Sequence, residues 1–194
     1  MGRFLWALIG FLGISTWSWG AEWTPFSRGP EVVEAALGCV QAQWATTELA
    51  DISTFLRRIA RAESACGMRT ETYRPGYYGG IWQVDRVAFE ETQRISAHPR
   101  LARWQQALRR QSQEKGLPVL DWNMVQWEQL TAPAYSCLAA RFYLACIPEA
   151  VPEGLVEQAV YWKKYYNTEA GAGTIRGFLR ANQGYPDSRR EARS

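Results

Sequence analysis

The feature of the sequence that most constrains the fold is an amphipathic pattern over residues 51–63. Its large apolar side chains recur at intervals of three or four residues: Ile52, Phe55, Leu56 and Ile59. This spacing, with arginines on the opposite face, predicts a helix packed against a hydrophobic core.

Glu63 stands out because helical geometry places its carboxylate on the apolar face of this helix. It follows Ile59 by four residues and Phe55 by eight. Burial of a carboxyl group raises its pKa, which is how a general acid is kept protonated near neutral pH. The alternative interpretation is that the helix has already ended and that Glu63 is solvated or paired with Arg69.

Further helices are predicted where apolar spacing and terminal Pro or Gly residues agree: 31–45, 85–93, 99–115, 133–147, 155–167 and 173–182. Asp85 is the expected N-cap of the second of these. The Gly- and Tyr-rich segment 66–80 predicts a loop or short hairpin, and the apolar residues 81–84 predict a short strand. The predicted fold class is therefore mainly α, a single α+β domain with a small β element beside the candidate site.

The N-terminal segment has the pattern of a secretory signal peptide. Arg3 precedes an apolar run over residues 4–14, and small residues lead up to Ala21. The run is too short to span a bilayer comfortably, and an uncleaved anchor or a buried helix is the alternative. We therefore expect a secreted protein without a stable membrane anchor, with a signal peptide at 1–20, one domain at 21–184 and a polar tail at 185–194.

Composition excludes several classes of function. The 194-residue chain carries 22 Lys and Arg against 19 Asp and Glu, and the net charge of +3 is too small to indicate a nucleic-acid partner. His98 is the only histidine, which excludes a multi-histidine metal site and most His-dependent catalysis. Ten Trp and nine Tyr are unusually many, and aromatic faces suit sugar rings, but composition alone does not indicate a sugar-binding groove. We expect no metal, no organic cofactor and a monomer.

Four cysteines follow the predicted signal peptide: Cys39, Cys66, Cys137 and Cys146. An even number of cysteines in a secreted protein predicts two disulfides. Cys137 and Cys146 lie in one predicted helix, where nine residues separate their Cα atoms by about 13.5 Å, too far for a bond. We therefore expect each of them to pair with Cys39 or Cys66.

Three short segments carry the candidate chemistry. They are Glu63-Ser64, then Gly80-Ile81-Trp82-Gln83-Val84-Asp85, and finally Tyr166-Asn167 with Ala170-Gly171-Ala172-Gly173. Each segment by itself is typical of a helix end, a cap or a turn. Together and in this order, they resemble the motifs of the goose-type lysozyme and soluble lytic transglycosylase superfamily, over roughly residues 51–178.

The resemblance implies a lysozyme-like fold and a muramidase that cleaves the β-1,4 bond between N-acetylmuramic acid and N-acetylglucosamine in peptidoglycan. It implies that Glu63 is the catalytic acid and that Asp85, or Glu71, holds water on the opposite face of the sugar. It further implies that Tyr166 orients the Glu63 region. The residues implied to contact the glycan are Gln83, Asn167, Tyr78 and Trp82.

The sequence departs from the family pattern at two positions, and alternatives therefore remain. Arg74 stands eleven residues before Asp85, where goose-type lysozymes have a further Asp, and Thr168-Glu169 interrupts the third motif. Hydrolysis is favoured because Asp85 is present. A lytic transglycosylase would use Glu63 alone and form a 1,6-anhydro ring. A lysozyme-like binding protein would recognise a glycan or a partner protein without turnover, and another enzyme would act on a related acetamido-sugar polymer such as chitin.

Overall fold

The computed structural model describes residues 21–44, 52–114, 120–169 and 171–184. Within these ranges the chain is mainly helical and contains no strand, which confirms the mainly α class. The predicted signal peptide and the predicted polar tail lie outside the described residues. None of the described helices has both the length and the apolar character needed to cross a membrane.

The helices begin and end close to the predicted positions. The α-helices are α1 (Pro30–Trp44), α2 (Ser53–Ser64), α3 (Arg86–Gln93), α4 (Pro99–Glu114), α5 (Pro133–Cys146), α6 (Leu155–Tyr161) and α7 (Ile175–Asn182). The 3₁₀ turns are η1 (Ala21–Trp23), η3 (Thr70–Tyr73), η4 (Ile95–Ala97), η5 (Trp122–Met124) and η6 (Trp127–Thr131). A π-helical turn, η7 (Trp162–Asn167), continues directly from α6. The predicted 155–167 helix is thus present, but its second half is wound differently.

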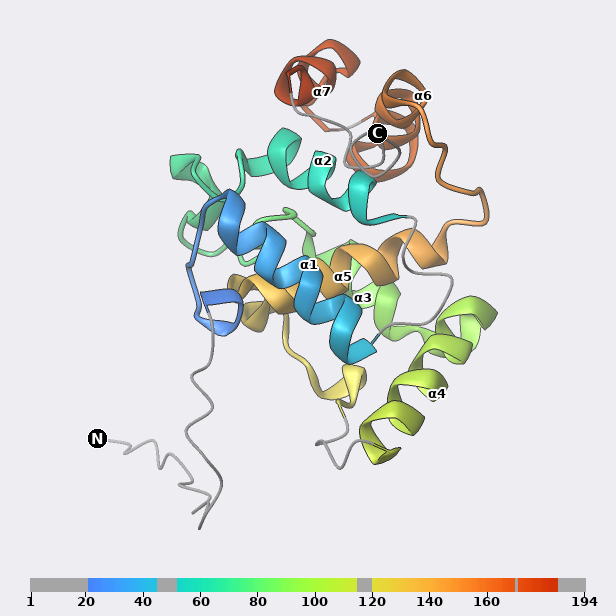
Figure 1. Cartoon of the computed structure of the whole chain (residues 1–194). Coiled ribbons are helices and arrows are strands. Elements are labelled where there is room, and N and C mark those ends of the chain that lie inside the picture. Colours follow the sequence, from blue (N-terminus) through green and yellow to red (C-terminus); the bar gives the residue numbers. More distant parts are fainter. Residues whose placement is uncertain (1–20, 45–51, 115–119, 170, 185–194) are drawn as a thin grey trace, which may run out of the picture.

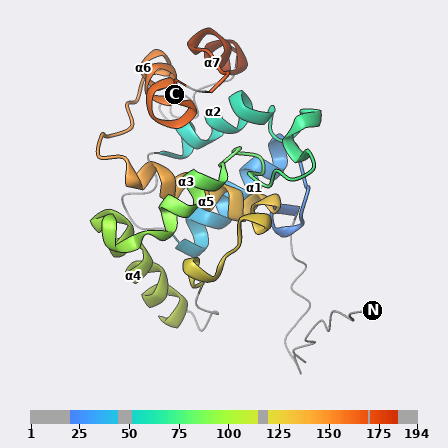
Figure 2. The ribbon, with the colours of Figure 1, turned by 180° about the vertical axis from the view of Figure 1, so that it is seen from behind.

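Helix α5 forms the centre of the domain. It packs against α1, α3 and α4, and Figures 1 and 2 show it between α1 on one side and α3 on the other. Pro133 occupies the first turn, where its missing N–H costs no intrahelical bond. Small buried residues, Ala134, Ala139 and Ala140, let the neighbouring helices approach closely. An all-round buried helix of this kind is expected only in the interior of a domain.

Helix α2 carries the apolar face that the sequence predicted. Phe55, Leu56 and Ile59 are fully buried. The helix ends where Ala65 and Cys66 adopt left-handed backbone conformations, with φ of 50° and 60°. Their N–H groups turn back to the carbonyls of the last helical turn, at 3.0 and 2.9 Å. This closure satisfies carbonyls that a helix end otherwise leaves without partners.

The C-terminal helices α6 and α7 cover α2 from above in Figure 1. Phe55 of α2 makes edge and tilted ring contacts with Tyr161 and Phe178, at 5.6 and 6.4 Å between ring centroids. The side-chain amide of Asn182 donates to the carbonyl of Arg58 at 3.2 Å. These contacts connect residues about a hundred positions apart, and they bring η7 to the C-terminal end of α2.

The prediction of a short strand over 81–84 is wrong. The segment is a turn, in which the Gln83 N–H donates to the Gly80 carbonyl and the Val84 N–H donates to the Gly79 carbonyl, both at 3.1 Å. Gln83 has a φ of 53°, which is incompatible with a strand. A short apolar run is buried equally well in a turn packed on all sides, and periodicity does not separate the two cases.

The predicted disulfides are also absent from the structure. All four cysteines are free thiols, and no two lie at disulfide distance. Burial raises the pKa of Cys39 to about 11 and that of Cys137 to about 12, so both thiols are protonated at neutral pH. Cys66, in the turn after α2, and Cys137, on α5, are buried among apolar residues, a common role for a cysteine.

Candidate active site

Glu63 lies in the last turn of α2, on the side that faces η7. Its Oε1 accepts a hydrogen bond of 2.8 Å from the indole N–H of Trp162. Burial raises the pKa of Glu63 from its ordinary value of 4.5 to about 7, although nearby donors and cations act in the opposite direction. Glu63 is partly buried, and the prediction that helical geometry places its carboxyl group on the packed face of α2 is confirmed.

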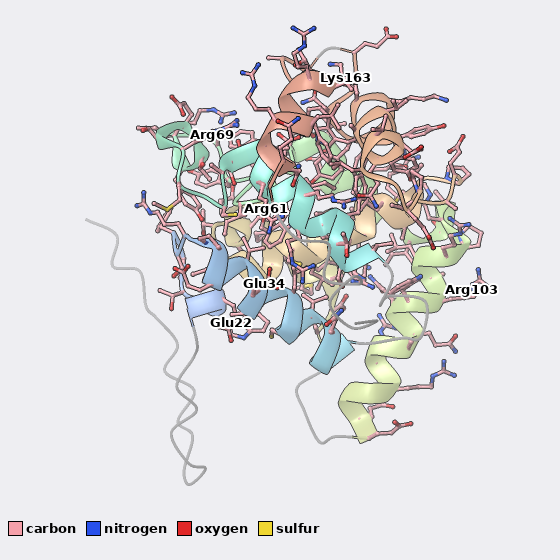
Figure 3. The ribbon with its side chains drawn as sticks, turned by 45° about the horizontal axis from the view of Figure 1, so that its top comes forward. Glu22, Glu34, Arg61, Arg69, Arg103 and Lys163 are labelled. Atoms are coloured by element: carbon pink, nitrogen blue, oxygen red, sulfur yellow. The ribbon has the colours of Figure 1, made fainter. Side chains whose placement is uncertain are left out.

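Two cations lie near Glu63 on different elements. Arg69, in the turn after α2, donates to the backbone carbonyl of Glu63 at 3.2 Å. Lys163, on η7, donates to the Asn167 side-chain oxygen at 3.0 Å and to two backbone carbonyls at 2.8 and 2.9 Å. Figure 3 shows both cations toward the top of the molecule. Their charges lower the pKa of Glu63, but less than burial raises it.

Ser64 connects the end of α2 to the second motif. Its buried hydroxyl donates to the Ile81 carbonyl at 2.6 Å and accepts from the Gly67 N–H at 2.8 Å. The hydroxyl group therefore holds the turn after the helix and the 79–85 segment in one geometry. In the Glu-Ser pair, the serine thus serves to position the backbone that carries Glu63.

The second motif needs glycine because the backbone runs against another element. Gly80 has a φ of 63°, and a Cβ there would lie 2.0 Å from the Leu130 carbonyl oxygen. The side-chain hydroxyl of Ser136 donates to the Gly79 carbonyl at 2.9 Å, and the Trp82 N–H donates to the same hydroxyl at 3.2 Å. The motif is thereby anchored to α5 at its start.

Gln83 is held within the protein. Its amide nitrogen donates to the carbonyls of Gly80 and Thr72, at 2.6 and 3.2 Å, and its side-chain oxygen accepts from Arg74 at 3.3 Å. Arg74 also lies over the ring of Tyr77, 3.6 Å from the centroid. Because both amide hydrogens are donated internally, the side chain links the 72–74 turn to the motif instead of offering free donors to a glycan.

Trp82 was predicted to contact the glycan, but the structure leaves none of its side chain accessible. Its side chain is fully buried, and its indole N–H donates to the Leu56 carbonyl of α2 at 2.9 Å. Tyr78, in contrast, is partly exposed and meets Trp127 edge-on, with the ring centroids 5.4 Å apart. Trp127 itself donates to the Val84 carbonyl at 3.0 Å. The aromatic surface beside the second motif therefore comes from Tyr78 and Trp127, not from Trp82.

The third motif packs over the other two. The hydroxyl of Tyr166 donates to the Trp82 carbonyl at 2.8 Å, and its ring meets Tyr143 of α5 edge-on at 5.7 Å. Burial raises the pKa of Tyr166 well above its ordinary value, and the charge of Glu63 acts in the same direction. Asn167 interacts with Glu63 through its side chain and helps to lower the pKa of that carboxyl group. The structure thus brings Tyr166, Asn167 and Glu63 together, as the motif order predicted.

The two candidate second carboxylates differ in position. Asp85 is the N-cap of α3, where its Oδ1 accepts from the Ala88 N–H at 2.7 Å, and Glu71 lies on η3. Both side chains belong to exposed residues. The capping role of Asp85 is confirmed.

A metal centre has no support in the described part of the chain. No group of three or more His, Cys, Asp and Glu side chains there is arranged to hold a metal ion. His98 pairs with Glu91, with 2.6 Å between Nε2 and Oε1. The only histidine of the sequence thus takes part in a side-chain interaction with a glutamate near the surface.

Comparison of the chain with models of protein families, with curated proteins and with solved structures gives no significant match. The function is therefore inferred from the residues of the site.

Sequence reasoning missed Trp162, which makes the most direct contact with Glu63. It is one of ten tryptophans, and the sequence pattern predicted a helix over 155–167 without a role for this residue. The available signal was its position four residues before Tyr166 of the third motif. Residues at that spacing lie on one side of a helix, so a ring at 162 was placed to reach what Tyr166 reaches.

Proposed function

We propose that this protein is a secreted, monomeric, muramidase-like glycosidase with a lysozyme-like fold. Its substrate is the glycan strand of peptidoglycan. The observation that carries the proposal is the carboxyl group of Glu63, held at the end of α2 with a pKa of about 7. Such a group is protonated in roughly half of the molecules at neutral pH, which suits a general acid. The three motif segments that carry the family resemblance are joined to one another by the hydrogen bonds of Ser64 and Tyr166.

In the proposed reaction, protonated Glu63 donates its proton to the glycosidic oxygen of the leaving sugar. Ser64 holds the backbone of the Glu63 turn through its bond to the Ile81 carbonyl. Tyr166 ties η7 to the second motif through the Trp82 carbonyl. These connections keep the acid in one orientation, which supports transfer to a bound sugar without reorganisation of the site.

For hydrolysis, a second carboxylate activates water on the opposite face of the sugar ring. Asp85 is the first candidate, because one of its oxygens is engaged by the N-terminus of α3 and the other is open to water. Glu71 is the second candidate. An inverting reaction requires a separation of roughly 6.5–9.5 Å between the two carboxyl groups. The proposed glycan contacts are Tyr78, which is partly exposed and packs against Trp127, and Asn167, which interacts with Glu63.

Two other functions have specific support. A lytic transglycosylase needs Glu63 alone, and the place of Asp85 as a helix cap favours this reaction, because that carboxylate already has a structural role. A glycan-binding protein without turnover is favoured by Arg74 at the position of the additional Asp. The products of peptidoglycan digestion distinguish these functions.

The deciding experiment is digestion of purified peptidoglycan by the mature protein, followed by mass spectrometry of the soluble muropeptides. Hydrolysis leaves a reducing end, whereas transglycosylation leaves a 1,6-anhydro end that is lighter by one water. Glu63→Gln should lower release by about 10²–10⁴-fold while binding to insoluble walls persists, since Gln keeps the shape but delivers no proton. If the Gln variant releases muropeptides as fast as the parent, Glu63 is not the acid.

The second carboxylate is tested by Asp85→Asn and Glu71→Gln in the same assay. For a hydrolase that uses Asp85, the Asn variant should lose at least ~100-fold while the Glu71 variant loses less. Asn retains much of the capping ability, so thermal stability should change little. Full activity of Asp85→Asn with anhydro products would replace hydrolysis by transglycosylation. A parent protein that sediments with cell walls but yields neither product would be a binding protein.

A further inference from the structure

Trp162 contacts the carboxyl group of the candidate acid directly. Its indole N–H donates to Oε1 of Glu63 at 2.8 Å, and only 2% of the residue is exposed. An indole N–H is a donor and never an acceptor. Oε1 therefore acts as the acceptor in this hydrogen bond, whether Glu63 is ionised or protonated.

The ring of Trp162 is locked in place from two sides. Phe178 of α7 packs against it with 5.0 Å between ring centroids and a tilt of 35°. On the other side lies Gly173, where an added Cβ would come within 2.4 Å of the indole ring. A glycine at 173 is therefore required by the ring itself. This gives the final glycine of the third motif a physical reason that concerns Glu63.

The π-helical turn explains why Trp162 and Asn167 both reach Glu63. In an α-helix, residues five positions apart point about 140° away from each other, given 100° per residue. In a π-turn, residues i and i+5 are joined by a hydrogen bond and lie nearly above one another. The π-turn from Trp162 to Asn167 thus places its first and last side chains on one face, toward the carboxyl group.

We propose that Trp162 is the positioning residue for the catalytic acid: its N–H occupies Oε1 of Glu63 and so directs the transferable proton to Oε2. This inference rests on the proposed function, because it assumes that Glu63 is the acid. It goes further by naming the oxygen that acts and the side chain that selects it. Without the indole N–H, Oε1 loses the donor that distinguishes it from Oε2.

The test compares Trp162→Phe, which keeps an aromatic ring and removes the N–H, with Trp122→Phe as the matched control. Trp122 is also buried and donates its indole N–H to Thr92 Oγ1, likewise at 2.8 Å. Its ring packs against Phe89 and Phe142, and its hydrogen bond does not involve Glu63. Both variants lose a buried indole hydrogen bond. Only the first loses one to the carboxyl group.

Two measurements are made on the full mature protein. In the first, kcat and KM for muropeptide release are measured as a function of pH. Trp162→Phe should lower kcat at least ~10-fold and should leave KM within about twofold of the parent value. In the second, carbon-13 NMR of the Glu63 carboxyl group is followed by titration. Because the indole bond lowers the pKa of Glu63, its loss should raise that pKa above the parent value of about 7. Trp122→Phe should leave both quantities unchanged.

The other groups that act on the titration remain in both variants. They are Arg69 from the turn after α2, Lys163, Tyr166 and Asn167 from η7, and Tyr77 beside the second motif. An unchanged pKa in Trp162→Phe overturns the inference, even if kcat falls, because the loss would then be structural. If the parent releases no muropeptides, the proposed function fails, and the titration by itself decides whether Trp162 holds the carboxyl group.

Discussion

Replacing Glu63 by glutamine is expected to stabilise the protein above neutral pH. Burial raises the pKa of this carboxyl group from 4.5 to about 7, so between these values the folded protein holds a proton that the unfolded chain has released. The free energy of unfolding of the parent therefore falls as the pH rises through this window. At about 1.4 kcal/mol per pKa unit, the total loss is about 3 kcal/mol.

Glutamine avoids this loss because it stays neutral at every pH. Its side-chain oxygen still accepts from the indole N–H of Trp162, so the packing around position 63 is retained. Below about pH 4.5 the parent and the variant should be similar in stability. Above pH 7 the variant should be more stable by about 3 kcal/mol, and the difference should then stay constant.

The assay is urea unfolding followed by far-ultraviolet circular dichroism, at a series of pH values from 4 to 8.5. The matched control is Glu71→Gln, the same substitution at an exposed position of η3, whose effect should stay within about 0.5 kcal/mol at each pH. A stability difference between parent and Glu63→Gln that does not change with pH would refute the reasoning, and so would a variant that is less stable than the parent at pH 8.

Three further substitutions test the packing around the site. Ser64→Ala removes a buried hydroxyl that joins α2 to the second motif, and should lower the free energy of unfolding by about 1–3 kcal/mol in urea denaturation. Gly80→Ala should cost at least ~2 kcal/mol by thermal unfolding, because its Cβ would meet the Leu130 carbonyl at 2.0 Å; Gly76→Ala, also at positive φ but with nothing within 4 Å, should cost less. Arg141→Met should stabilise the protein by at least ~1 kcal/mol, since its buried guanidinium has no hydrogen-bond partner in the described structure; a loss of stability would show that the cation is compensated.

Local sequence patterns determined the helices of this protein and the character of its central carboxyl group. The spacing of Phe55 and Ile59 determines which face of α2 is buried, and Glu63 lies on that face by helical geometry alone. Asp85 was predicted as a helix cap because an Asp before a helical pattern offers its side chain to the free N–H groups. These features depend on residues within a few positions of one another, which is why they can be predicted without the tertiary structure.

The tertiary structure decided how the apolar and aromatic residues are used. Trp82 and Gln83 have the side chains of ligand-binding residues, but contacts with Leu56 and Thr72 direct both into the protein. An even number of cysteines after a predicted signal peptide is typical of a disulfide-bonded protein. In the structure, however, the packing keeps the four sulfur atoms apart. The type of a residue determines which interactions its side chain is able to make. Its use depends on which neighbours the fold brings to it.

The contact between Glu63 and Trp162 illustrates the difference most directly. The two residues are 99 positions apart, and they meet because α6 and α7 pack across α2 and because the chain is wound as a π-turn at 162–167. No periodicity in the sequence predicts a change from α- to π-winding, since both bury one face. The local sequence therefore determined that the Glu63 side chain lies on the packed face of α2. The packing of distant helices decided which of its two oxygens is held.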